Sequence, residues 1–180
     1  MALHIVEVRH HCWPDEPAVA VALAPFSLST DRLVAELRSC VHTPAAYQQG
    51  GLQQYLADTI KRHLQNTLTS SYGLSLASDR YSPKLNESAD LALARDSSGK
   101  RIFFEVEFRP NVEKDLVKFQ IGENRGTLAA AVLILAIDRT NINRAYSTMP
   151  EYDKFERIIQ ELRPSYPLVL LGIRVSNNAA

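Results

Sequence analysis

The chain has 180 residues, 46% of them hydrophobic and 22% charged, and its 20 Lys and Arg balance 20 Asp and Glu. This composition is typical of a folded protein rather than a disordered or fibrous one, and the length fits one domain with a sizeable core. A formal charge of zero excludes a histone-like polycation but leaves room for a local basic groove.

The amino-terminal residues predict an intracellular protein. His4, Glu7 and Arg9 stand where a signal peptide would have its apolar core. We therefore expect a cytoplasmic chain whose two cysteines, Cys12 and Cys40, stay reduced. The longest apolar run, 128–137, is short of the roughly 20 residues that span a bilayer, so no membrane partner is expected.

The first fifty residues predict few regular elements. Met1 to Val8 suits a strand, and three prolines between residues 14 and 25 predict a mostly irregular stretch. Apolar residues at helical spacing then predict a short helix between Ser29 and Cys40, with Ser29 or Thr30 as its cap. We treat residues 1–50 as an extension without an assigned role.

The pattern becomes regular after residue 51. Apolar residues at every fourth position predict a long helix: Leu52, Leu56, Ile60, Leu64 and Leu68. Tyr72 to Leu76 suits a short strand. Two strand-like runs, Asp90 to Arg95 and Arg101 to Phe108, are separated by a polar turn and predict a β-hairpin.

A helix, a strand, a helix and a last strand are expected to follow the hairpin. Asn111 would cap the first of these helices, and Gly122 with Gly126 would end it. The run 128–137 predicts a central, buried strand. The last helix is expected to begin near Ser147 or Thr148 and to end before Pro164. The expected inward residues of the two helices are Val112, Leu116, Phe119, Phe155, Ile158, Ile159 and Leu162. With a final strand at 167–175, the chain predicts an α/β fold, a mixed sheet flanked by helices.

The strand that ends at Phe108 alternates apolar residues with glutamates. Alternation sends the apolar side chains to one face, which we expect to be core. It sends Glu105 and Glu107 to the other face, which we expect to be the chemical one.

The hairpin register decides whether Asp90 joins the two glutamates. Pairing Leu93 with Phe104 keeps the large apolar side chains of both strands on the core face. This register sets Asp90 opposite Glu107 and a small residue, Ala92, opposite the other glutamate.

Three carboxylates this close repel one another, so they would either raise a pKa or bind a cation. Hard oxygen ligands favour Mg²⁺, which takes one or two carboxylates together with water and substrate phosphate. Zinc would more often require His or Cys ligands.

These residues resemble a known family. Ala89-Asp90, fourteen intervening residues and Glu105-Val106-Glu107 are similar to a divergent catalytic motif of the PD-(D/E)xK nuclease superfamily, in which the usual lysine is replaced. The replacement, the helix after it and the strands at 128–137 and 167–175 resemble the BamHI and BglII group of type II restriction endonucleases, the BglII side most. The resemblance covers about 53–175 and departs from the superfamily at Ala89, where proline is common.

The resemblance implies a single restriction-endonuclease-like domain, 1–180, with its nuclease core at about 51–175. It also implies a site in which Asp90 and Glu105 hold the divalent ion and the carbonyl of Val106 is a further ligand. Glu107 stands in the place of the lysine and would orient or deprotonate the attacking water or bind a second metal. Lys118 would supply the displaced positive charge, and Lys114, one turn earlier, is equally well placed by spacing.

The implied activity is Mg²⁺-dependent hydrolysis of DNA phosphodiester bonds by a type II restriction enzyme. Such an enzyme acts as a homodimer on a short palindromic site in double-stranded DNA, and a cognate DNA methyltransferase would accompany it. The candidate DNA-contacting residues, chosen for donors suited to phosphates and base edges, are Lys84, Arg109, Asn141, Asn143 and Arg144. Two alternatives stay open: a catalytically idle DNA-binding protein of the same fold, and an unrelated interaction protein with an exposed hairpin face.

Overall fold

The computed structural model describes residues 3–42, 52–77, 80, 88–95, 99–108, 113–137 and 151–176. These residues form one mixed sheet of seven strands in the order β2-β1-β7-β6-β5-β4-β3. The strands are β1 (Leu3–Trp13), β2 (Val41–His42), β3 (Ser75–Leu76), β4 (Leu91–Ala94), β5 (Arg101–Glu107), β6 (Leu128–Ala136) and β7 (Leu168–Ser176). The helices are α1 (Glu16–Leu23), a 3-10 turn (Ala24–Phe26), α2 (Thr30–Ser39), α3 (Leu52–Tyr72), α4 (Glu113–Asn124) and α5 (Glu151–Leu162).

The predicted order of elements after residue 51 is confirmed. From α3 onward the chain forms a helix, three strands, a helix, a strand, a helix and a strand. β5, β6 and β7 run parallel because α4 and α5 cross over between them, whereas β3, β4 and β5 pair antiparallel. The predicted class, a mixed α/β sheet flanked by helices, is confirmed.

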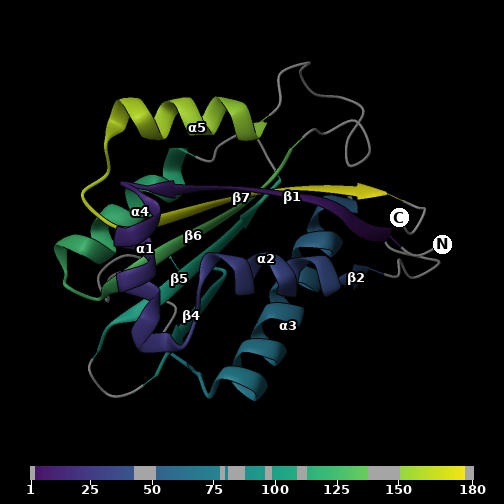
Figure 1. Cartoon of the computed structure of the whole chain (residues 1–180), viewed down its shortest axis with the longest axis horizontal. Coiled ribbons are helices and arrows are strands. Elements are labelled where there is room, and N and C mark those ends of the chain that lie inside the picture. Colours follow the sequence, from purple (N-terminus) through teal and green to yellow (C-terminus); the bar gives the residue numbers. More distant parts are fainter. Residues whose placement is uncertain are drawn as a thin grey trace.

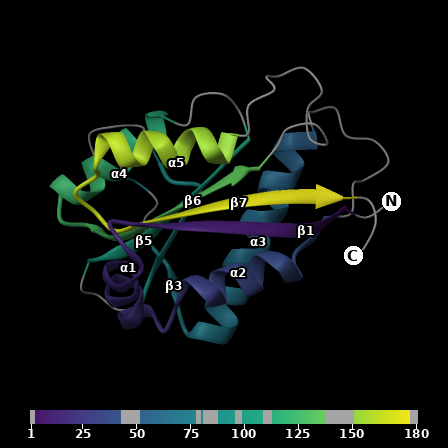
Figure 2. The same cartoon turned by 45° about the horizontal axis from the view of Figure 1, so that its top comes forward.

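The amino-terminal segment is more regular than predicted. β1 runs on to Trp13 and pairs antiparallel with β7 along its length (Figure 2). The expected irregular stretch is wrong, because α1 begins directly after Asp15, whose carboxylate accepts a hydrogen bond from the Ala18 N–H at 2.8 Å. Pro17 lies in the first turn of α1, where its missing N–H leaves no helical hydrogen bond unmade.

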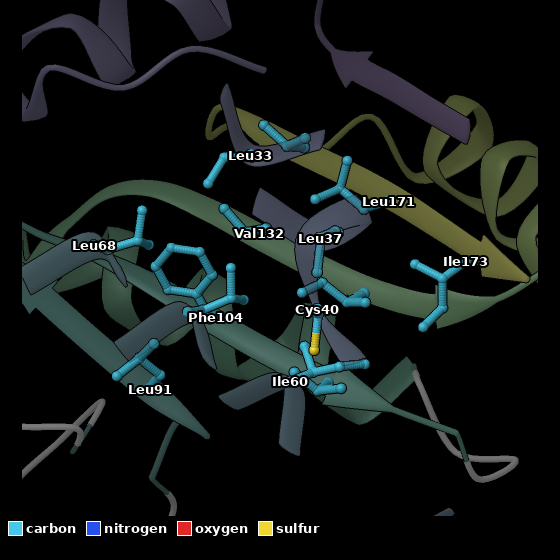
Figure 3. Packing of buried hydrophobic residues seen from close by; sticks show 14 of the residues in the cluster. Leu33, Leu37, Cys40, Ile60, Leu68, Leu91, Phe104, Val132, Leu171 and Ile173 are labelled. Atoms are coloured by element: carbon cyan, nitrogen blue, oxygen red, sulfur yellow. The ribbon is translucent and has the colours of Figure 1, made fainter. Parts of the chain in front are cut away.

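Both faces of the sheet are buried, which corrects the expected division into one core face and one chemical face. α1, α2 and α3 cover one face and α4 and α5 cover the other, so that α3 and α5 lie on opposite sides of the sheet (Figure 1). Figure 3 shows part of the first core, where Leu37 of α2 and Ile60 of α3 belong to the same cluster as Phe104 of β5 and Val132 of β6. Phe103 belongs to the second core, together with Phe119 of α4. Parallel strands covered by helices on both faces leave no solvated face.

The hairpin forms as predicted, but its register differs by two residues. Leu91, not Leu93, pairs with Phe104, and Ala92 pairs with Phe103. A shift of two residues keeps every side chain on its predicted face, so the apolar pattern alone cannot distinguish the two registers. The observed register carries Asp90 to the level of Glu105 instead of Glu107.

Several helix ends also differ from expectation. α4 continues through Gly122 to Asn124, and the turn to β6 is made at Gly126, whose φ is +67°. Leu162, at the end of α5, is 60% exposed rather than inward-facing, whereas the expected inward residue Phe155 is buried. The expected caps of these two helices, together with Val112, lie outside the described residues. In the part of the chain that the structure describes, no single helix has the length and apolar character to cross a membrane; the bent pair Glu16–Phe26 and Thr30–Ser39 has them only jointly.

Candidate active site

A pocket of about 130 Å³ lies at the carboxyl end of β5. It is lined by residues from four segments of the chain: Ala57, Lys61, Ser88, Asp90, Glu105, Val106, Glu107, Phe108, Lys114 and Lys118. All four predicted catalytic residues and the predicted carbonyl ligand, Val106, are among them. The fold therefore gathers this part of the predicted site into one place.

Asp90 is fixed at the end of the hairpin by the backbone of β5. Its Oδ2 accepts a hydrogen bond from the Val106 N–H at 2.8 Å, and Val106 lies two residues beyond Phe104, the last β5 residue that pairs with β4. The Asp90 carboxylate thus takes the place of a backbone acceptor of β4 for the Val106 N–H. Its Oδ1 lies 3.3 Å from the Lys61 Nζ of α3, and Lys61 in turn lies 3.0 Å from Asp58 Oδ1.

Glu105 is buried under α4, with 4% of its surface exposed. Its Oε1 accepts a hydrogen bond from the Lys118 Nζ at 3.0 Å, and the same Nζ lies 2.9 Å from Oδ1 of the buried Asp115. Burial raises the pKa of Glu105 to about 8, and the charges of Asp115 and Asp90 act in the same direction against the lowering effect of Lys118. Burial also raises the pKa of Asp115. For Lys118, burial alone would lower the pKa, but the two carboxylates outweigh it and raise the pKa.

Glu107 is more accessible to solvent than Glu105, on the same side of β5. Its Oε2 lies 3.7 Å from the Lys114 Nζ, which is more than half exposed. Each of the two α4 lysines thus pairs with a different glutamate: Lys114 with Glu107, and Lys118 with Glu105. The sequence spacing had left these two lysines equivalent.

The charges around the pocket fit a divalent cation. Ion pairs connect three lysines to five carboxylates among the described residues: Lys61, Lys114 and Lys118 to Asp58, Asp90, Glu105, Glu107 and Asp115. With all eight groups ionised the formal charge is −2, which one divalent cation would neutralise. Without a cation, a proton on Glu105 relieves part of the repulsion, in line with its raised pKa.

The donor set suits a hydrated ion rather than a fully protein-bound one. Within the described ranges, no three His, Cys, Asp or Glu side chains are grouped so that they could hold a metal by themselves. Asp90 and Glu105, with the Val106 carbonyl, offer two carboxylates and one neutral oxygen. Mg²⁺ is commonly held by one or two carboxylates with several waters, so these residues fit it.

The predicted DNA-contacting residues lie outside the described residues: Lys84, Arg109, Asn141, Asn143 and Arg144. Phe108 precedes Arg109 at the pocket, and β6 ends beside β5, with Leu135 opposite Glu107. Their contacts with DNA stay a prediction.

Sequence reasoning missed Lys61, Asp58 and Asp115. Asp58 and Lys61 have the i, i+3 spacing of a helix ion pair, which is the signal that could have found them. Asp115 has the same spacing to Lys118. Nothing in the sequence showed that Asp115 is buried, because that depends on how α4 packs on the sheet.

A comparison with protein-family models finds no match for this chain, and a comparison with curated proteins finds none either. The site is therefore interpreted from its own geometry.

Proposed function

We propose that this chain is a Mg²⁺-dependent endodeoxyribonuclease with a restriction-endonuclease-like fold. The observation that carries the proposal is the meeting of Asp90 and Glu105 at the carboxyl end of β5, in a pocket that also holds the Lys118 ammonium group. Metal-assisted attack of water on a phosphodiester requires acidic metal ligands and positive charge near the phosphate, and this pocket offers both.

Five of the residues that line the pocket have a role in this proposal. Asp90 and Glu105 would hold Mg²⁺, with the Val106 carbonyl as a further ligand; the bound ion supplies Lewis-acid activation of water and phosphate. Glu107 lies next to Glu105 along the strand and is better hydrated, so it would orient or deprotonate the attacking water. Lys118 would offset the negative charge that builds up on the phosphate oxygens.

The finer assignment rests on the sequence resemblance. It names double-stranded DNA as substrate, a short palindromic recognition site, a homodimer in which each subunit cuts one strand, and a cognate DNA methyltransferase. The order of elements from α3 to β7 supports it, because that order accompanies the motif in the resemblance.

The burial of Glu105 favours catalysis over an unrelated interaction protein with an exposed hairpin face. On a merely exposed hairpin face a carboxylate would be hydrated, and Asp90 would have no reason to lie beside it. A buried carboxylate with a raised pKa in a pocket is costly to stability and is more frequent at functional sites. A catalytically idle member of the fold is an outcome of the experiment below.

The test is incubation of the purified protein with mixed genomic DNA and Mg²⁺, with EDTA and Glu105→Gln as negative controls. Glu113→Gln is the matched control, because Glu113 is an exposed acidic residue of α4 that pairs with Lys154 away from the pocket. Discrete fragments from wild type and Glu113→Gln alone support a restriction enzyme. A smear lost in both negative controls supports a nuclease without sequence specificity, and intact DNA with Mg²⁺ and Mn²⁺ overturns the proposed activity.

A further inference from the structure

The ion pair of Lys61 and Asp90 has no part in the proposed hydrolysis, although it reaches into the same pocket. Lys61 belongs to α3, on the sheet face opposite α4, so it approaches the carboxylates from the other side than Lys114 and Lys118 do. Its Nζ bridges two carboxylates, at 3.3 Å from Asp90 Oδ1 and 3.0 Å from Asp58 Oδ1.

We infer that Lys61 is a tethered counterion, which holds Asp90 while the site lacks a divalent cation and withdraws to Asp58 when one binds. The inference rests on the proposed function in one respect, since it takes Asp90 to be a metal ligand. It adds a residue that sets the metal affinity of the site.

The two oxygens of Asp90 have different partners, and this carries the argument. The Val106 N–H donates to Oδ2 and the Lys61 Nζ lies 3.3 Å from Oδ1, so a cation that binds through Oδ1 meets the ammonium group of Lys61. An ammonium group and a divalent ion at the same oxygen repel each other strongly at such short range. Lys61 therefore has to give up Asp90 for the ion to bind there.

Asp58 makes this withdrawal possible without leaving an unpaired charge. It lies one turn before Lys61 on α3, and its contact with Lys61 is the shorter of the two. The lysine stem is flexible, and the side chain keeps 24% of its surface exposed, so Nζ can swing toward Asp58 while α3 stays in place. Asp58 thus lowers the cost of releasing Asp90.

The test is calorimetric titration of Mn²⁺ into the DNA-free protein, in wild type, Lys61→Gln, Lys114→Gln and Asp58→Asn. Lys61→Gln should bind Mn²⁺ about two- to fivefold more tightly, the range set by partly exposed ion pairs. Lys114→Gln is the matched control, because Lys114 lines the same pocket but neighbours Glu107 at 3.7 Å; its affinity should change less than twofold. Asp58→Asn should bind Mn²⁺ more weakly than wild type, because Lys61 then stays on Asp90.

Equal effects of Lys61→Gln and Lys114→Gln would show a general charge effect and overturn the inference. Thermal unfolding of each variant verifies that it is folded. DNA cleavage by wild type without a specific Lys61 effect contradicts the inference and leaves the nuclease standing. A specific Lys61 effect in a protein that cuts no DNA supports the role of Lys61 and contradicts the nuclease activity. A wild type that binds no Mn²⁺ contradicts both the role of Lys61 and the nuclease activity.

Discussion

Glu105 is a carboxylate that the fold buries against one ammonium group and near two other carboxylates. Burial makes its ionised form costly, and Lys118 offsets only part of that cost, so the pKa rises to about 8 from an ordinary 4.5. Between these two values the folded protein holds a proton that the unfolded chain has lost. The free energy of unfolding therefore falls as the pH rises through this window.

We predict that Glu105→Gln removes this pH dependence. In EDTA, wild type should lose stability from pH 5 to pH 8.5 with a slope of at most about 1.4 kcal/mol per pH unit from this one group, and the variant should show a flatter profile. Urea unfolding at several pH values measures it. Parallel profiles for the two proteins would mean that Glu105 ionises normally.

Asp115 shows how a residue outside the predicted motif supports the site. Its side chain is 1% exposed and its Oδ1 lies 2.9 Å from the Lys118 Nζ, so it helps to hold the ammonium group in front of Glu105. Removing one partner of a buried pair leaves the other inadequately satisfied.

Accordingly, Asp115→Asn should destabilise the protein by about 1–3 kcal/mol, since the amide keeps the shape but loses the charge. Glu113→Gln on the same helix should change the stability by less than about 0.5 kcal/mol, because its ion pair with Lys154 is exposed. Denaturant unfolding compares the two. Equal losses would argue that Asp115 is not specifically paired.

At the scale of elements, α5 is held on the sheet by a close approach over β7. A Cβ at Gly172 would lie 2.8 Å from Cγ of Tyr152 and 3.0 Å from Cγ1 of Ile137. Tyr152 is buried at this contact. Position 172 thus requires glycine for packing, since the Tyr152 ring of α5 occupies the space that a side chain at position 172 would need.

Gly172→Ala should therefore destabilise the protein by about 1–3 kcal/mol through overpacking. In a Tyr152→Leu background the same substitution should cost less, because the smaller side chain makes room. Thermal unfolding of the four proteins of this cycle measures the coupling. If the stability losses of Gly172→Ala and Tyr152→Leu are additive, the cost of the alanine does not come from its contact with Tyr152.

The whole molecule assembles its pocket from four separate segments. α3 supplies Lys61 from one face of the sheet, α4 supplies two lysines from the other, and the hairpin places Asp90 and Glu105 between them. Any cation that binds these groups in the folded state alone stabilises the whole fold.

Ca²⁺ should consequently raise the Tm of wild type, by an amount that corresponds to about 2.7 kcal/mol at a hundredfold excess over its Kd. Asp90→Asn should abolish most of this shift while keeping the fold, because an amide oxygen can still accept the Val106 N–H. Thermal scans with Ca²⁺ and with EDTA measure both. The same shift in Asp90→Asn and wild type would exclude Asp90 as a ligand.

Local sequence patterns were enough to predict the elements after residue 51 and the main candidates of the site. Helix and strand periodicities depend on neighbouring residues, so the apolar stripe of α3 and the alternation in β5 were readable directly. The same local signals placed Asp90 and Glu105 on one hairpin.

The register, the burial and the partners of these residues depend on tertiary packing. A two-residue slip leaves the alternation unchanged. The alignment of Asp90 with Glu105 instead of Glu107 is therefore set by how β4 pairs with β5 in the folded sheet. The burial of Glu105 and Asp115 follows from the docking of α4, and the contact of Lys61 with Asp90 follows from the docking of α3. These are contacts between distant segments, and their energies depend on which groups the fold removes from water.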